Sequence, residues 1–161
     1  MRTRFAFALT VASCLACASA NAGGLVPGFR GMQWGDSAAK LGASTPLPKA
    51  KPTDYDCYTR ATDKPAINDI PVKPIRYCFH DDKFVFLHIE FDKKFTSQMK
   101  KSVAAAYGAP NFATSDYLTW GNDKEPGGGT VSMLFNSVQM SSNDAARASA
   151  AEELAKARKD F

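Results

Sequence analysis

The sequence lacks the residue patterns of the common hydrolases. It contains no Gly-x-Ser-x-Gly and no His-Glu-x-x-His motif, and it has only two histidines in 161 residues. These motifs present a nucleophilic serine or bind a catalytic zinc ion. Carboxylate pairs such as Asp54/Asp56 and Glu90/Asp92 have a spacing that acid–base catalysis can use, but on strands such pairs usually face solvent. We therefore expect no enzymatic activity, no cofactor and no metal site.

Long hydrophobic runs are also missing. No segment has the roughly 20 apolar residues of a membrane-spanning helix. Two arginines near the N-terminus, the apolar run Phe5–Val11 and a small-residue end instead predict a signal peptide over residues 1–22. Cleavage after Ala20 or Ala22 fits this pattern, and we favour Ala22. We expect residues 23–161 to form a single domain that is periplasmic or secreted.

The N-terminal segment has a second interpretation. Val11-Ala12-Ser13-Cys14 resembles a bacterial lipobox, in which Cys14 would carry a lipid. The protein would then be anchored to the envelope. The apolar segment before Cys14 would be only the seven-residue stretch Phe5–Val11, and small apolar residues continue past it, which favours the ordinary signal peptide.

The excess of positive charge is small. The formal net charge is +4 for the whole chain, and it falls to about +2 when Arg2 and Arg4 leave with the signal peptide. A nucleic-acid-binding domain normally carries a much stronger basic footprint. We therefore expect no nucleic-acid partner.

Cysteine is scarce after residue 22, where only Cys57 and Cys78 remain. An exported protein with an even pair of cysteines most simply forms one disulfide bond. Each cysteine lies in a strand-like segment, so neighbouring strands could bring them together. Residues 23–161 contain no Cys-x-x-Cys motif, which argues against a redox-active pair.

Local patterns predict an α+β domain. A short helix begins at Asp36 or Ser37 and ends at Gly42, and a second helix runs over Ser97–Tyr107 with Met99, Val103 and Tyr107 on one buried stripe. An Ala-rich helix is expected over Ala145–Phe161. Six strand-like segments are expected: Tyr55–Arg60, two in the hairpin over Ile75–Asp92, Tyr117–Trp120, Thr130–Phe135 and Val138–Ser141. We therefore predict an antiparallel sheet of about six strands with helices on one face. The order indicates two αβββ copies followed by a C-terminal helix.

The hairpin over Ile75–Asp92 carries the candidate binding surface. If it has a regular two-residue turn, one of its two apolar faces is aromatic. We predict that this face binds a partner through Tyr77, Phe79, Phe84, Phe86 and His88. The alternative is that the C-terminal helix covers it. The same register points His80 and His88 to different faces, which argues against a shared metal ion.

The motifs resemble those of known exported proteins. The helix end Tyr107-Gly108-Ala109-Pro110 followed by Trp120 is similar to the αβ-repeat fold of the SmpA/OmlA outer-membrane assembly lipoproteins and the β-lactamase inhibitor protein. In the first copy Leu41-Gly42 matches, but Pro46 lies later than in that pattern. The start Phe29-Arg30-Gly31-Met32-Gln33-Trp34-Gly35 and the later Tyr58-x-Arg60 resemble uncharacterised exported bacterial proteins. The resemblance implies a fold and a binding role and transfers no residue function.

We therefore expect an exported, non-enzymatic protein that binds another macromolecule, most simply a protein, through its sheet. A specific version is an inhibitor or immunity-type protein. The alternatives are an envelope assembly or structural accessory, which a lipidated Cys14 would favour, and a small hydrolase or ligand carrier.

Overall fold

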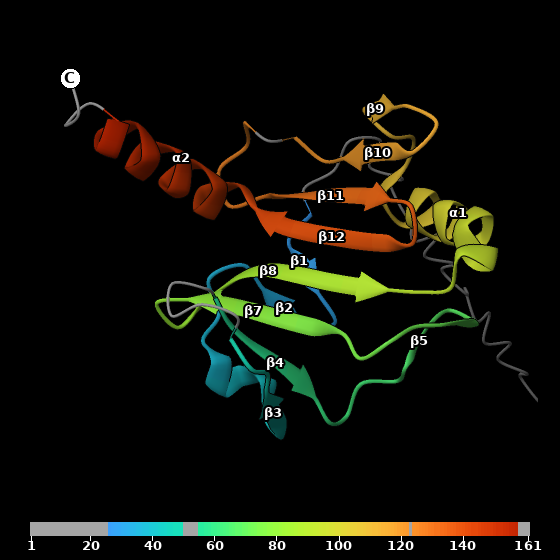
Figure 1. The fold of residues 1–161 in the computed structure, drawn as a ribbon, viewed down its shortest axis with the longest axis horizontal. Helices are drawn as coiled ribbons and strands as arrows, with labels where there is room; N and C mark the ends of the chain where they lie inside the picture. The colour runs from blue at the N-terminus through green and yellow to red at the C-terminus, as the bar shows by residue number, and fades with distance from the viewer. Residues whose placement is uncertain (1–25, 50–54, 123, 158–161) are drawn as a thin grey trace, which may run out of the picture.

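Eight strands form one antiparallel sheet at the centre of the molecule (Figure 1). The structure is a computed structural model that describes residues 26–49, 55–122 and 124–157. The expected signal peptide over 1–22, with Cys14, lies outside these residues. The sheet and two α-helices confirm the mixed α+β class.

The strands of the sheet are β3 (Ser44–Pro46), β4 (Asp56–Arg60), β7 (Arg76–His80), β8 (Lys83–Glu90), β9 (Phe112–Ala113), β10 (Tyr117–Trp120), β11 (Gly129–Leu134) and β12 (Ser137–Ser142). Their order is β3-β4-β7-β8-β12-β11-β10-β9, so two four-stranded meanders meet where β8 pairs with β12. The expected count of about six strands is too low. The two further strands, β3 and β9, are three and two residues long, and each lies in a proline-containing segment that weakens its strand pattern.

Smaller elements complete the fold. They are the hairpin β1 (Gly28–Phe29) and β2 (Met32–Gln33), the hairpin β5 (Ala66–Ile67) and β6 (Ile70–Pro71), the 3₁₀ turns η1 (Ala38–Leu41) and η2 (Lys93–Phe95), and the helices α1 (Thr96–Tyr107) and α2 (Asn143–Ala157). The expected first helix is therefore a single 3₁₀ turn.

Helix α1 packs on the sheet through the predicted stripe. Met99 and Val103 are buried, and Tyr107 is partly buried against the same core. The helix ends at Gly108, whose φ of 84° is a conformation that favours glycine. The Trp120 indole N–H donates to the carbonyl oxygen of Gly108 at 3.0 Å, which links the helix end to β10. This bond explains why Trp120 follows the Tyr107–Pro110 motif, since the indole binds the carbonyl group at which the helix ends.

The N-terminal hairpin covers the other half of the same sheet face. In Figure 1, β1 and β2 lie behind the sheet. The Trp34 ring stacks on Phe84 of β8 with centroids 4.8 Å apart, and Met32 is buried in the core. Gly129 of β11 allows this approach, because a Cβ atom there would lie 2.5 Å from Trp34 Nε1. The core face is therefore closed by the N-terminal hairpin and α1.

The turn between β7 and β8 is the expected two-residue turn. Asp81 and Asp82 both have positive φ, at 48° and 57°, as a type I′ turn requires. His80 pairs with Lys83 directly across it.

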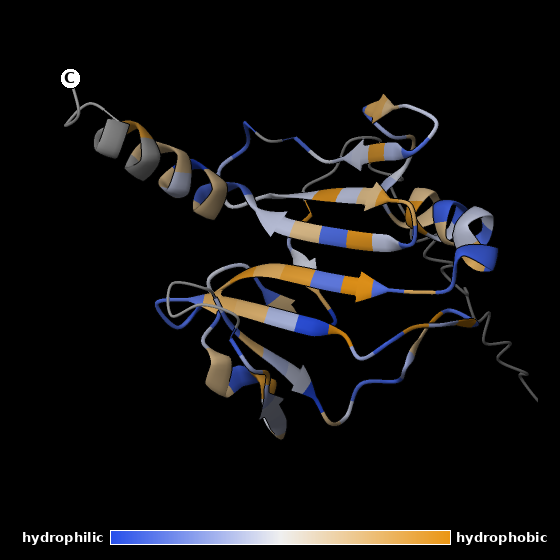
Figure 2. Cartoon of the chain, in the orientation of Figure 1, coloured by the Kyte–Doolittle hydropathy of each residue, from blue (hydrophilic) through white to orange (hydrophobic). Residues whose placement is uncertain are grey.

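A β-bulge interrupts β8 just beyond this turn. Phe79 pairs with Phe84, but Cys78 pairs with Phe86, so Val85 is one extra residue on β8. Because side chains alternate along a strand, an extra residue reverses the faces of all those that follow. Figure 2 shows a continuous apolar stretch in β8, which comprises residues 84–87, whereas β12 alternates between apolar and polar residues.

The bulge separates the five predicted binding residues. Tyr77, Phe79 and Phe84 are fully buried in the core beneath the N-terminal hairpin. Phe86 and His88 are half-buried on the opposite face, since their neighbours Leu87 and Ile89 point into the core. The expectation that the five side chains share one face is therefore wrong. The C-terminal helix, which was the alternative expected cover of the aromatic face, does not cover these rings.

Helix α2 leaves the sheet at the end of β12 and extends away from it (Figure 1). Its first residue, Asn143, is buried, and its side-chain amide donates to the carbonyl oxygens of Asn122 and Glu125. These bonds hold the connection between β10 and β11. Leu154, farther along the helix, is exposed. The helix is therefore fixed mainly at its N-terminal end.

Cys57 of β4 and Cys78 of β7 form the predicted disulfide bond, and they are direct cross-strand partners. The bond closes a loop with a sequence separation of 21. We expect Cys57→Ser to lower the free energy of unfolding by about 2–5 kcal/mol, because the unfolded chain regains the freedom of that loop. Urea unfolding of oxidised parent and variant measures this. Equal stability of the two proteins would contradict it.

Candidate outer-face binding site

The sheet face opposite the core carries the candidate site. In Figure 1 none of the helices in the described residues crosses this face, which we call the outer face. Strand alternation and the bulge place on it the side chains of Arg76, Cys78 and His80 from β7, Phe86, His88 and Glu90 from β8, Ser137, Gln139 and Ser141 from β12, and Thr130, Ser132 and Leu134 from β11. On this face β11 and β12 therefore present mostly uncharged hydroxyl and amide groups.

Four rings form a continuous row on this face. Tyr55 lies just before β4 and is 43% exposed. Its centroid is 5.9 Å from that of His80 and 6.5 Å from that of Phe86. Phe86 in turn stacks near His88 at 6.4 Å. We call Tyr55, His80, Phe86 and His88 the outer-face cluster.

The bulge is what brings the two histidines to the same face. A regular hairpin would place them on different faces, and that expectation is wrong. The rings of Tyr55 and Phe86 lie between them in the row. Across the residues that the structure describes, no group of three or more potential metal ligands gathers.

Charged side chains border the cluster. Glu90 accepts a hydrogen bond from Lys73 at 2.7 Å and another from Arg76, and these partners lower the pKa of its carboxyl group. Burial lowers the pKa of His88, and the positive charges of Arg76 and Lys73 lower it further, against an opposing effect of Glu90. His88 therefore favours the neutral form and presents an uncharged ring beside Phe86. Because the single carboxylate of Glu90 is paired with two cations, Lys73 and Arg76, this edge of the cluster keeps a net positive charge.

A second polar network lies at the far end of β4, and the sequence analysis did not assign it. Asp63 accepts hydrogen bonds from Arg60 at 2.8 Å and from the Tyr77 hydroxyl at 2.7 Å, and Arg30 lies 3.4 Å away. Burial raises the pKa of the Tyr77 phenol, and the Asp63 carboxylate raises it further.

This network joins residues of the two quoted motifs. Arg30 belongs to the Phe29–Gly35 motif and Arg60 to the Tyr58-x-Arg60 motif. Arg60 also donates to the carbonyl oxygen of Arg30 at 3.2 Å. Since Asp63 is saturated by partners from the chain itself, the network ties the N-terminal hairpin to β4 and β7 rather than binding a ligand. In the sequence, the only indication of this network is the arginine in each of the two motifs.

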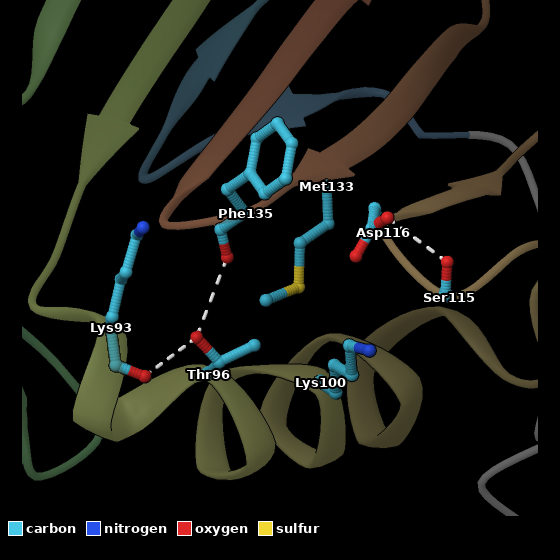
Figure 3. Close-up of a pocket in the computed structure, with 7 residues that line it drawn as sticks. All are labelled: Lys93, Thr96, Lys100, Ser115, Asp116, Met133 and Phe135. Carbon is cyan, nitrogen blue, oxygen red and sulfur yellow. Dashed lines mark hydrogen bonds between the residues drawn. The ribbon is translucent and has the colours of Figure 1, made fainter.

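A pocket of about 180 Å³ lies elsewhere, between α1 and the turns beside β10 and β11 (Figure 3). It is lined by Lys93, Thr96, Lys100, Ser115, Asp116, Met133 and Phe135. A wider and shallower hollow lies beside it around Val72 and Phe91. Neither touches the outer-face cluster.

None of the helices in the described residues has both the length and the apolar content to cross a bilayer. No family model, curated protein or solved structure matches the chain.

Proposed function

We propose that the chain is an exported, non-enzymatic protein that binds another protein through the outer face of its sheet. The observation that carries this proposal is the outer-face cluster, a row of rings on a sheet face that no helix crosses. Aromatic side chains supply large contact areas at low cost in conformational entropy, and they are enriched where proteins bind each other. Phe86 and His88 keep their predicted role, and Tyr55 and His80 join them.

The surroundings of the cluster indicate the chemistry of the partner. Uncharged Ser and Gln side chains on β12 lie next to the rings, while Arg76 and Lys73 form a positive border. An interface centre depleted of charge with a polar rim is typical of protein–protein contacts. The partner surface is therefore apolar at its centre and acidic at the edge that meets Arg76. This arrangement suits an inhibitor or immunity-type protein.

The arrangement of the strands supports the two-copy interpretation of the sequence. Each half of the sheet is a four-stranded meander preceded by a helical segment that ends at a glycine with positive φ, Gly42 or Gly108. We infer that the halves are two copies of one unit joined through β8 and β12. A joined sheet of this kind provides one wide face, as a binding protein requires.

Alanine variants test the binding role. Tyr55→Ala and Phe86→Ala should each weaken partner capture from a periplasmic extract by about 30-fold, since hot-spot residues contribute about 2 kcal/mol or more. Leu154→Ala is the matched control, because Leu154 is exposed on α2 away from the outer face. Quantitative mass spectrometry of the captured proteins, beside thermal melting, gives the result. A partner that all three variants retain equally, while they remain folded, would refute the proposed surface.

A further inference from the structure

A second apolar patch lies at the β9–β10 edge of the sheet, away from the outer-face cluster, and its Tyr117 and Leu134 belong to the same outer face. Of the six large hydrophobic side chains that are exposed in the described residues, four gather around β9, β10 and the β11–β12 turn. They are Phe112, Tyr117, Leu134 and Phe135, which are 55%, 36%, 40% and 54% exposed. Tyr117 pairs with Leu134 across the strands, and its ring centroid lies 6.2 Å from that of Phe112.

The neighbouring segment is strongly basic. Residues 93–101 include Lys93, Lys94, Lys100 and Lys101 and contain no acidic residue. The Thr96 hydroxyl donates to the carbonyl oxygen of Lys93 at 2.7 Å and lies 3.4 Å from that of Phe135, so the start of α1 lies beside the exposed ring. Lys93 and Lys100 line the pocket next to that ring (Figure 3).

The composition of this end distinguishes between two kinds of partner. Protein interfaces are enriched in arginine and depleted of lysine, whereas surfaces that lie on membranes combine lysines with aromatic residues and leucine. The basic segment here has four lysines and no arginine, beside three aromatic residues and one leucine. We propose that this end of the molecule lies on an anionic phospholipid surface, with Phe135 and Leu134 at the boundary of the acyl chains and Lys93 and Lys100 at the headgroup phosphates.

The pocket refines this arrangement. Its volume of about 180 Å³ admits a headgroup phosphate between Lys93 and Lys100, with the Thr96 hydroxyl beside it. Asp116 lines the same pocket, and its carboxylate opposes a bound anion. Within the described residues, Lys93 and Lys100 form no ion pair, whereas Lys94 pairs with Asp92, so Asp116 is the carboxylate that shares the pocket with the two lysines. Removing the negative charge should therefore strengthen binding.

Co-sedimentation of the purified protein with vesicles tests the proposal. We expect binding to vesicles of phosphatidylglycerol and phosphatidylcholine, and loss of binding at about 1 M salt, where the Debye length falls to about 3 Å. The double variant Lys93→Gln/Lys100→Gln should bind about 30-fold more weakly, because each lysine near an anionic surface contributes about five-fold. Phe135→Ser should lose about ten-fold through the missing apolar contact. Asp116→Asn should gain about five-fold.

Lys83→Gln is the control, since Lys83 lies beside the β7–β8 turn at the other end of β8, and its binding should equal that of the parent. A soluble phosphate ligand would behave differently, because glycerophosphate would then displace the protein from the vesicles and Phe135→Ser would have no effect. That result would overturn the proposal. The proposal would also be overturned if the parent protein did not bind anionic vesicles, or if Lys83→Gln weakened binding as much as Lys93→Gln/Lys100→Gln. An acidic protein segment captured in place of vesicles would assign the surface to a protein instead.

Discussion

Replacing Val103 with aspartate should prevent folding at ordinary temperatures. Val103 is buried between α1 and the sheet, so the variant would place an unpaired carboxylate in the core. The cost of such burial is comparable to the whole stability of a domain of this size. Circular dichroism and urea unfolding measure the effect.

Ala105→Asp is the matched control for this variant. Ala105 lies two residues farther along α1 and is exposed, so the same new charge remains in water. The control should lose only about 1 kcal/mol, from the lower helix propensity of aspartate and its negative charge near the helix C-terminus. If both variants melt like the parent, α1 does not pack on the sheet through Val103.

Replacing Phe84 with alanine should lower the free energy of unfolding by about 3–5 kcal/mol, as is usual for a buried phenylalanine. Phe84 is fully buried and stacks on Trp34. Phe86→Ala should cost only about 1–1.5 kcal/mol, because Phe86 is half-buried on the outer face.

This pair measures the effect of the bulge directly. In a regular strand, positions 84 and 86 would share a face and the two substitutions would have similar costs. Guanidinium unfolding of both variants under oxidising conditions gives the comparison. Equal losses of stability would contradict the bulge at Val85 and restore a single aromatic face.

The sequence predicts the elements whose patterns are strong. Helix α1 has an apolar stripe at helical spacing and a glycine stop, and the disulfide was expected from one even pair of cysteines in a chain predicted to be exported. These features depend on local spacing and composition, which the sequence states directly. Both could therefore be predicted without any knowledge of the tertiary structure.

The bulge could not be predicted because four consecutive apolar residues, Phe84–Leu87, follow the first residue of β8. In such a run, hydropathy gives no indication of which residue is extra, since either face could be buried. The consequence was large, because one misplaced residue moved Phe86 and His88 to the other side of the sheet. The outer-face cluster is therefore visible only in the tertiary structure.

The N-terminal hairpin was missed for a different reason. Its turn uses Arg30, with a φ of 47°, where a tight turn usually has asparagine, aspartate or glycine. Long-range bonds stabilise that turn, since the Arg30 guanidinium donates to the carbonyl oxygens of Lys64 and Ala66. Contacts between segments more than 30 residues apart leave no local pattern in the sequence. The sequence therefore gives no indication that residues 28–34 cover the aromatic core.

The central claim is that a partner protein binds on the outer face of the sheet. Photo-crosslinking in intact cells tests it most directly, with a benzophenone amino acid at Gln139, which is exposed and pairs with His88 at the centre of that face. The same probe at Ala105, exposed on α1, is the control. We predict one discrete protein adduct from position 139 that Tyr55→Ala abolishes, and none from position 105. An adduct from position 105 alone, or no adduct from position 139, would contradict the account.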